Sequence, residues 1–375
     1  MQISRRSFLR TSALGAGAGV AVGAFSFPEF ARSEPQRNPQ IAGGPVLLNS
    51  NENAYGPWPS VMEAMGTALP YANRYPDSHY EALVGKIAEL HRIKPEQVVT
   101  GCGSSEILRI VAEIFCKPGT TLITASPTFE SLGVYVSTRG GKVRTVPLNA
   151  KFEHDLPQMG AQSGEKVGLV YICNPNNPTA NLTPRKDIEA FLKTLGPDTY
   201  VLIDEAYHHF AVSSPEYASF IDHPVDDPRV IVARTFSKIY GLAGIRLGYA
   251  VAVPEIAKQM RQFTTFDNVN MVAAQCGVAG LDDAAGLATA VKRIAADREE
   301  FVRQAQQRKM AVIPSAANFA MMQTGKPIRE LIAYFKKNNV LIGRPFKGME
   351  TYARISFGTP EQMKIFWQTW DKMPS

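Results

Sequence analysis

The stretch RTFSKIYGLAGIRLGY, residues 234–249, combines one lysine with hydroxyl side chains and a following arginine in a loop of small residues. A neighbouring cation lowers the pKa of a buried lysine such as Lys238, whose free amine can then bond covalently to an aldehyde. Thr235, Ser237 and Arg246 offer the hydrogen bonds that a phosphate accepts. The stretch therefore predicts a site for pyridoxal phosphate, a cofactor that carries both an aldehyde and a phosphate. The alternative is a surface loop with ordinary basic residues.

A second segment, VLIDEAY at residues 201–207, is an apolar run that ends in an acid. It predicts a buried strand with Asp204 at its carboxyl end, the edge of an open α/β sheet where ligands bind. A buried carboxylate there can pair with a pyridinium nitrogen, and Tyr207 can donate to the phenolic oxygen of the same ring. The alternative is that Asp204 caps a helix.

Two further segments each combine a strand pattern with a turn. LVYICNPNNPT, residues 169–179, ends in a proline-rich turn that can aim an asparagine at a ligand, or whose asparagines satisfy their own backbone. VVTGCGSSEIL, residues 98–108, predicts a strand, a glycine turn and the start of a helix. Gly103, Ser104 and Ser105 could present amides and hydroxyls to an anion there, or the serines could be simple caps.

Hydrophobic runs along the chain alternate between strand and helix patterns. Strands are expected at residues 120–125, 142–148, 167–173, 200–204 and 230–233, and helices at 105–115, 129–138 and 184–195. This alternation predicts an α/β fold, a mostly parallel sheet with helices on both faces. A long helical region, 254–310, should lead into a smaller α+β domain. The predicted division is a segment 34–70 packed on the small domain, a large domain 71–285 and the small domain 286–375.

In this order, the four segments resemble the class I/II aminotransferases, pyridoxal phosphate enzymes of fold type I, and most of all their histidinol-phosphate aminotransferase branch. NENAYGP at residues 51–57 is similar to the N-terminal motif of that branch, and RISFGT at 354–359 to its C-terminal motif. The resemblance runs from about Val46 to the C-terminus. The chain departs from it at Ala180, where the family often has glycine, and at Phe129, where tyrosine is common.

The resemblance implies roles for the cofactor site. Lys238 would hold the cofactor and then move the proton between Cα and C4′, while Asp204 would hold the pyridine nitrogen. Asn177 and Tyr207 would bind the ring hydroxyl, and Phe129 would stack on the ring. The predicted phosphate group consists of Gly103, Ser104, Ser105, Thr235, Ser237 and Arg246, joined by Tyr55 from a second copy of the chain.

The resemblance also implies that Arg354 clamps the α-carboxylate of the substrate in a two-pronged ion pair. The rest of the predicted substrate group is Asn53, Tyr55, Asn177 and Arg344. Because Tyr55 would cross to another copy, a homodimer is expected. The expected activity is transfer of an amino group from an amino acid to a 2-oxo acid. The alternatives are a histidinol-phosphate aminotransferase, a decarboxylase or racemase on the same scaffold, and a binding protein without turnover.

The N-terminus has the pattern of an export signal. SRRSFLR at residues 4–10 is a twin-arginine motif, and an Ala/Gly-rich apolar stretch follows from about residue 13 to 27. Small residues permit cleavage near Ser33. The sequence thus predicts a signal peptide at residues 1–33 and transport of the folded protein by the twin-arginine translocase to the periplasm. A basic amphipathic arm is the alternative.

Composition narrows the remaining classes. The chain has 375 residues, is 45% hydrophobic and carries a formal charge of +6. Residues 1–33 hold four arginines and one glutamate, hence +3, which leaves about +3 (6 − 3) on the rest of the chain, too little to suggest nucleic-acid binding. Its four cysteines lack the spacing of metal ligands, so no metal site is expected.

Overall fold

The computed structural model describes residues 44–162 and 166–374. The chain forms two units, Met1–Ala42 and Gly43–Ser375, of which the first lies outside the described residues. The predicted signal peptide, residues 1–33, and the start of the predicted segment 34–70 therefore also lie outside them.

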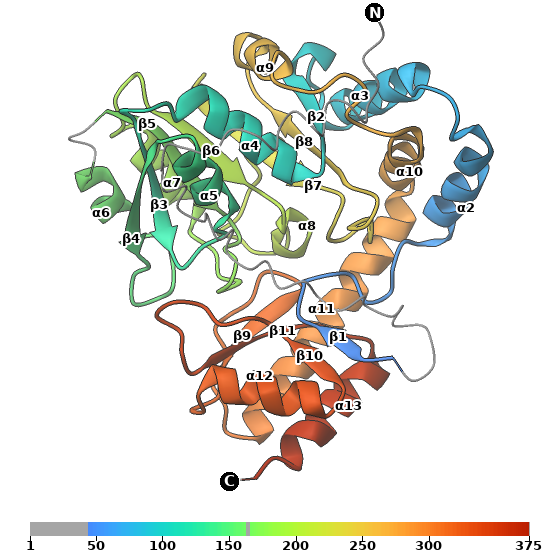
Figure 1. Ribbon diagram of the computed structural model, residues 1–375, viewed down its shortest axis with the longest axis vertical. Helices are drawn as coiled ribbons and strands as arrows, with labels where there is room; N and C mark the ends of the chain where they lie inside the picture. Colours follow the sequence, from blue (N-terminus) through green and yellow to red (C-terminus); the bar gives the residue numbers. More distant parts are fainter. Residues whose placement is uncertain (1–43, 163–165, 375) are drawn as a thin grey trace, which may run out of the picture. The chain divides into compact units, whose positions relative to one another are not determined.

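A seven-stranded sheet forms the centre of the second unit, in the order β2-β8-β7-β6-β5-β3-β4 (Figure 1). All neighbours pair in parallel except β8, which is antiparallel to both β2 and β7. The strands are β2 (Val98–Cys102), β3 (Thr121–Ser126), β4 (Lys142–Pro147), β5 (Val167–Cys173), β6 (Tyr200–Asp204), β7 (Val230–Thr235) and β8 (Leu247–Val251). The sheet confirms the predicted fold, although the sequence analysis did not identify β8.

The inner strands β5, β6, β7 and β8 are buried on both faces and largely apolar, whereas the edge strand β4 is mostly exposed. Alternate residues of β5 belong to different hydrophobic clusters, Val170 and Ile172 to one and Leu169 and Tyr171 to the other. One cluster includes side chains of α4 (Ser104–Phe115), α5 (Ser131–Thr138) and α9 (Pro254–Arg261). The other includes side chains of α3 (Asp77–His91), α6 (Leu156–Ala161), α7 (Arg185–Leu192) and α10 (Met271–Asp282).

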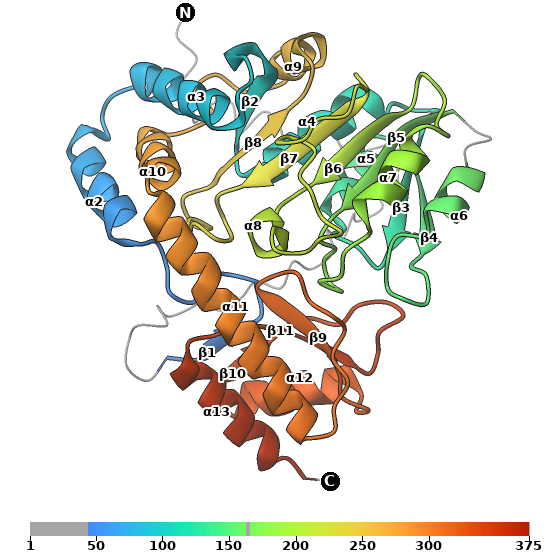
Figure 2. The ribbon, with the colours of Figure 1, turned by 180° about the vertical axis from the view of Figure 1, so that it is seen from behind.

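Two small sheets lie in the C-terminal part. Antiparallel β9 (Phe319–Gln323) and β11 (Tyr352–Ser356) form one, and parallel β1 (Val46–Leu48) and β10 (Val340–Ile342) form the other. Figures 1 and 2 show these sheets beside α11 (Ala284–Gln307), α12 (Ile328–Lys337) and α13 (Pro360–Asp371). Within the segment predicted at 34–70, β1 joins this part, whereas α2 (Pro59–Ala68) packs against α10.

The helical region expected at 254–310 consists of three helices, α9, α10 and α11. Side chains that cap helix N-termini cause the division. Asn270 accepts a hydrogen bond from the amide of Ala273 at the start of α10, and Asp283 accepts one from the amide of Gly286 at the start of α11. Such caps favour the start of a new helix over continuation of the old one. The short helix α8 (His208–Ala211) completes the large part.

Candidate active site

Lys238 lies in the loop that joins β7 to the antiparallel strand β8. Its Nζ donates to the carbonyl oxygen of Asn51 at 3.1 Å and lies 5.6 Å from the ring centre of Tyr207. Burial, together with the charge of Arg354, lowers the pKa of Lys238 to about 8. About a tenth of Lys238 is therefore free amine at pH 7, far more than for an ordinary lysine, and a covalent bond to an aldehyde requires this form.

Asp204 ends β6 and is almost completely buried. Its Oδ1 accepts a hydrogen bond from the amide of Ala206 at 3.0 Å, and its Oδ2 accepts one from the hydroxyl of Tyr171 at 2.8 Å. Burial raises the pKa of Asp204, whereas these hydrogen bonds and the charge of Lys238 oppose the increase. The structure thus places a buried carboxylate at the carboxyl end of a central strand, as the sequence predicts.

Tyr207 and Asn177 approach the same region from two sides. The Tyr207 hydroxyl accepts a hydrogen bond from Asn51 Nδ2 at 3.0 Å, so the tyrosine proton remains available to another acceptor. Asn177 Oδ1 accepts a hydrogen bond from Arg354 Nη1 at 2.8 Å. Both side chains are therefore held in place by the protein with hydrogen-bonding capacity left over.

The residues of the predicted phosphate group lie together at the start of α4. Gly103 has a φ of +73°, and a Cβ at this position would overlap the guanidinium of Arg246. Arg246 Nη1 lies 3.5 Å from Ser237 Oγ, which is 3.0 Å from Thr235 Oγ1. Ser104 and Ser105 begin the helix, where backbone amides are free to bind an anion.

Arg354 on β11 is buried, with 8% of its surface exposed. Its Nη1 donates to Asn177 Oδ1 and its Nη2 donates to the carbonyl oxygen of Asn49 at 2.6 Å, but its buried Nε has no hydrogen-bond partner. None of the described residues places a carboxylate on this guanidinium, and burial lowers the pKa of Arg354 to about 10. The site therefore holds a cation that lacks an anion.

The other predicted substrate residues are already engaged. Asn53 Nδ2 donates to the carbonyl oxygen of Ile239 at 2.8 Å, which joins the loop at residues 51–57 to the lysine loop. The Tyr55 hydroxyl donates to Asp297 Oδ2 of the same chain at 3.0 Å. Arg344 is exposed and donates to Glu130 Oε2 at 2.6 Å.

Phe129, predicted to stack on a cofactor ring, is half-buried in the loop after β3. The neighbouring Thr128 Oγ1 donates to Asn176 Oδ1 at 2.7 Å, so this loop is fixed to the turn that carries Asn177. In the same turn, Ala180 has a φ of +61°, a conformation that favours glycine. The chain thus keeps the backbone of the motif although it lacks the usual glycine there.

The sequence analysis missed the central position of Asn51. Its amide and its Oδ1 both bond to Ser356 Oγ, at 2.8 and 3.1 Å. Its carbonyl oxygen accepts from both Lys238 Nζ and Asn318 Nδ2. Asn51 thus links Lys238 and Tyr207 by hydrogen bonds to the small sheet of β9 and β11. The signal was its presence in the quoted motif at residues 51–57.

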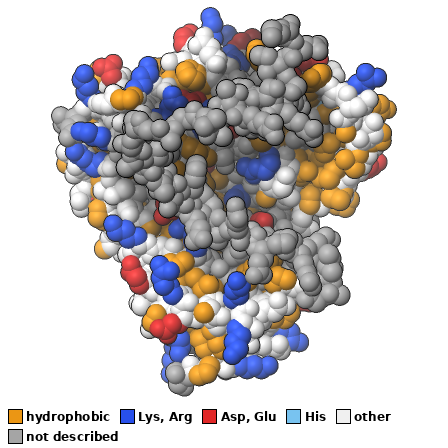
Figure 3. Space-filling view, in the orientation of Figure 1, with side chains coloured by type: hydrophobic (Ala, Val, Ile, Leu, Met, Phe, Trp, Pro, Cys, Tyr) orange, Lys and Arg blue, Asp and Glu red, His pale blue; other side chains and the backbone are white. Residues whose placement is uncertain are grey.

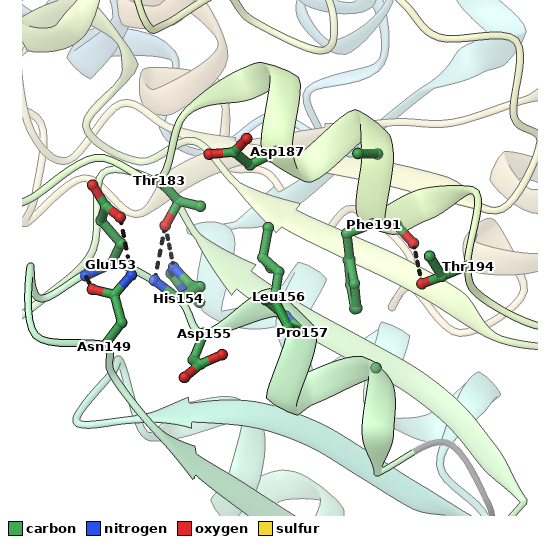
Figure 4. A pocket seen from close by; sticks show the side chains of 12 residues that line it. Asn149, Glu153, His154, Asp155, Leu156, Pro157, Thr183, Asp187, Phe191 and Thr194 are labelled. Carbon is green, nitrogen blue, oxygen red and sulfur yellow. Dashed lines mark hydrogen bonds between the residues drawn. The ribbon is translucent and has the colours of Figure 1, made fainter.

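A separate pocket of about 620 Å³ lies between α6 and α7 and contains none of the predicted site residues (Figure 4). His154 lines it and bonds through Nδ1 to Thr183 Oγ1 at 2.8 Å, and burial lowers the pKa of His154 to about 4. Among the described residues, no set of three or more His, Cys, Asp or Glu side chains is arranged to hold a metal. Nor does any described helix combine the length and apolar character needed to span a membrane.

Sequence comparison identifies relatives along nearly the whole described chain. The model of the family "Aminotransferase class I and II" matches residues 44–369. A histidinol-phosphate aminotransferase of Moorella thermoacetica is 33% identical over 323 residues, which is 86% of this chain and 83% of that protein. An aromatic amino acid aminotransferase of Rhodococcus jostii is 35% identical over 324 residues, covering 86% of this chain and 88% of that protein.

Structural comparison agrees with the sequence relatives. The crystal structure of histidinol-phosphate aminotransferase from Sinorhizobium meliloti in complex with pyridoxal-5′-phosphate superposes with a TM-score of 0.81 at 27% identity. The superposition covers 86% of this chain and 88% of the Sinorhizobium chain. The buried lysine, carboxylate and arginine thus lie on the scaffold of an enzyme that binds this cofactor. The chain belongs to the class I and II aminotransferases, and it is a transaminase that depends on pyridoxal phosphate.

Proposed function

We propose that this transaminase takes the amino group from an amino acid bound through its α-carboxylate to Arg354 and passes it to a 2-oxo acid. One observation carries the proposal: Arg354 is a buried cation that no described carboxylate neutralises and whose Nε has no partner. A buried charge is costly unless it is paired. An α-carboxylate supplies two oxygens for a guanidinium and would complete this site.

The donor set also fits pyridoxal phosphate. Lys238 has a lowered pKa, and the glycine at 103 leaves room for Arg246 beside the start of α4. We assign the phosphate to Gly103, Ser104, Ser105, Thr235, Ser237 and Arg246, and the ring to Asn177, Asp204, Tyr207 and Phe129. Oriented amides, hydroxyls and one guanidinium match a phosphate dianion.

The bound cofactor serves as the electron sink for the electrons of the substrate Cα–H bond. The Asp204 carboxylate would stabilise the protonated pyridine nitrogen, and the Tyr207 hydroxyl would donate to the ring oxygen. Lys238 Nζ would hold the cofactor through its aldehyde and, as a free amine, would move the proton of the substrate Cα. Arg354 orients the α-carboxylate so that the Cα–H bond, and not a carbon–carbon bond, is the one that breaks.

A histidinol-phosphate substrate is the second candidate, since several relatives bear that name. Its phosphate would bind to Arg354, with Arg344 as the second cation. Arg344, however, already bonds Glu130 at 2.6 Å, so among the described residues of this site Arg354 is the arginine without a carboxylate partner. A single cation at this place favours a singly charged α-carboxylate over a doubly charged phosphate. The predicted export from the cytoplasm agrees, because histidine biosynthesis takes place in the cytoplasm.

The test is a half-reaction without acceptor. Purified protein loaded with pyridoxal phosphate is mixed with aromatic, acidic, basic and aliphatic amino acids and with histidinol phosphate, and the absorbance of the bound cofactor is followed. Stoichiometric conversion to the aminated cofactor with release of a 2-oxo acid is the expected result for an amino acid. Conversion by histidinol phosphate alone would support the second candidate. Release of carbon dioxide or racemised substrate would contradict both.

We further propose export by the twin-arginine translocase, based on the motif SRRSFLR at residues 4–10. A mature chain in the periplasm, and its retention in the cytoplasm when Arg5 and Arg6 are both replaced by lysine, are the expected results of cell fractionation. The same division between cytoplasm and periplasm for the wild type and for the lysine variant would contradict the proposal.

Finally, we propose a homodimer in which Tyr55 reaches the phosphate site of the other copy. On the face in Figure 3, hydrophobic side chains gather over α2, and the exposed apolar residues include Met62, Leu69 and Tyr71. Such a patch marks an interaction surface. Sedimentation should give a dimer, and Met62→Glu should yield monomers. A monomeric wild-type protein with full activity would exclude a shared site.

A further inference from the structure

Tyr171 belongs to none of the groups assigned above, yet it makes a short hydrogen bond to a residue of the proposed site. It lies on β5 with 1% of its surface exposed, and its hydroxyl donates to Asp204 Oδ2 at 2.8 Å. Strand register explains the approach. Cys173 pairs with Asp204 and Tyr171 pairs with Leu202, so Tyr171 and Asp204 emerge on the same sheet face from neighbouring strands.

The hydrogen bond is directional and permanent over the working pH range. Burial, and the negative charge of Asp204, raise the pKa of Tyr171 well above its ordinary value. The tyrosine therefore keeps its proton and serves Asp204 as a donor. With the amide of Ala206 on Oδ1, both carboxylate oxygens have a fixed donor, which determines the plane of the carboxylate.

The effect of this hydrogen bond opposes that of burial. Burial raises the pKa of Asp204, and the Tyr171 hydroxyl acts most strongly in the other direction. The other titratable groups near the carboxylate are the Cys173 thiol from β5, Glu205 and Tyr207 from the loop after β6, and Lys238 from the loop after β7. The Cys173 thiol donates to the carbonyl oxygen of Pro175 at 3.4 Å. Tyr171 is therefore the principal side-chain donor among the described residues around Asp204.

We propose that Tyr171 is a positioning residue of the transaminase, which keeps the Asp204 carboxylate ionised and oriented for the pyridine nitrogen of the cofactor. The inference rests on the function proposed above for Asp204. In this role Tyr171 does not contact the substrate. Its action is confined to the charge and the orientation of one carboxylate.

The test is the protonation of Asp204 in the cofactor-free protein, followed by infrared spectroscopy as a function of pH. The carbonyl band of a protonated carboxylic acid that is absent in Asp204→Asn belongs to this residue. In Tyr171→Phe, the midpoint of that band should move upward by about one to two pH units, the size expected for the loss of a hydrogen bond to a charged group. The affinity for pyridoxal phosphate at neutral pH should fall by about ten-fold, and this decrease should vanish in the Asp204→Asn background.

Tyr249→Phe is the matched control. Tyr249 is a buried tyrosine of the same sheet, and its hydroxyl bonds to His91 Nε2 at 2.8 Å instead of Asp204. This variant should leave the infrared midpoint unchanged. Replacement of Tyr171 by 3-fluorotyrosine, a stronger donor of nearly the same shape, should move the midpoint downward and covers the case in which Tyr171→Phe does not fold.

The outcomes separate the inference from the function on which it rests. An Asp204 midpoint that is the same in wild type, Tyr171→Phe and the fluorotyrosine protein would overturn the inference. If instead Asp204→Asn binds and converts pyridoxal phosphate as the wild type does, the proposed function of Asp204 is wrong, whatever the infrared result.

Discussion

Arg234 and Arg354 are both buried arginines, yet their surroundings are opposite. Arg234 on β7 lies within 3.0 Å of carboxylate oxygens of Glu205 and Asp222, and its Nη2 donates to Ser219 Oγ at 2.6 Å. Arg354 on β11 has an amide oxygen, a backbone carbonyl and one unpartnered nitrogen. Burial lowers the pKa of both guanidinium groups, but at Arg234 the surrounding negative charges, including Glu205 and Asp222, outweigh it and the pKa rises.

The difference separates a structural cation from a functional one. The ion pair at Arg234 is complete without any ligand, so Arg234 contributes to the stability of the fold and not to ligand binding. The desolvation cost of the buried Arg354 charge is offset only when an anion binds. An unpaired buried charge is therefore a stronger indication of a ligand site than a buried charge with a partner.

The largest expected effect is that of Arg354→Met on catalysis. Loss of the cation should lower kcat/KM for amino acids by about two to three orders of magnitude, as expected when one partner of a buried charge pair is removed. The ligand-free protein should be as stable as the wild type or more so, since an unpaired charge has gone. Steady-state kinetics and thermal unfolding check the two parts. A drop in Tm without a loss of kcat/KM would reverse the comparison.

Arg234→Met should show the opposite pattern. It leaves Glu205, with a side chain only 1% exposed, without its cation, and the free energy of unfolding should fall by about 3–5 kcal/mol. Urea denaturation measures this change. The double variant Arg234→Met/Glu205→Leu should regain much of the loss because it buries no unpaired charge. If the double variant is less stable than Arg234→Met, the ion pair is not the source of the effect.

Arg354 also affects the lysine. Folding lowers the pKa of Lys238 from 10.5 to about 8, so the buried ammonium destabilises the cofactor-free fold fully below about pH 8. Between pH 8 and 10.5 the unfolded state binds more protons, and stability should therefore rise with pH. The Lys238 side chain is only half-buried, so the full effect of the lowered pKa is reduced by solvent and the contribution is on the order of 2 kcal/mol.

The measurement is the pH dependence of unfolding of the cofactor-free protein, taken as a difference from Lys238→Met, in which this rise should be missing. In Arg354→Met the rise should begin at higher pH, since the neighbouring cation is gone. An identical curve in all three proteins would show that Lys238 does not titrate in this window.

The sequence alone predicted the parts of the site that depend on local order. A strand that ends in Asp204, a small-residue loop around Lys238, and a glycine turn before a helix are all readable from neighbouring residues. Contacts across strands were not readable. The pair of Tyr171 and Asp204 depends on the register of β5 and β6, and the many bonds of Asn51 depend on a chain segment that returns from the small part.

The two arginines show the same limit. Both stand in motifs quoted from the sequence, but their partners lie far from them in the chain. The residues near Arg354 in the sequence do not indicate that Asn177, and not a carboxylate, will contact it. The same holds for a third arginine, Arg344, whose contact with Glu130 cannot be predicted from its neighbours. Strand β8 was missed although its residues, LGYAV, are largely apolar, and its antiparallel direction depends on the return of the lysine loop.

The smallest effect is expected at the third arginine, Arg344, which is exposed and paired with an exposed Glu130 at 2.6 Å. Ion pairs of this kind contribute about 0–1 kcal/mol, so Glu130→Gln should change the free energy of unfolding by no more than that. The same change frees a cation near the site. KM should therefore fall a few-fold for substrates that carry more than one negative charge, such as acidic amino acids with their second carboxylate or histidinol phosphate with its phosphate dianion, and stay unchanged for neutral amino acids. Steady-state kinetics with both classes measure the difference, and an equal change for both would place Arg344 outside the substrate site.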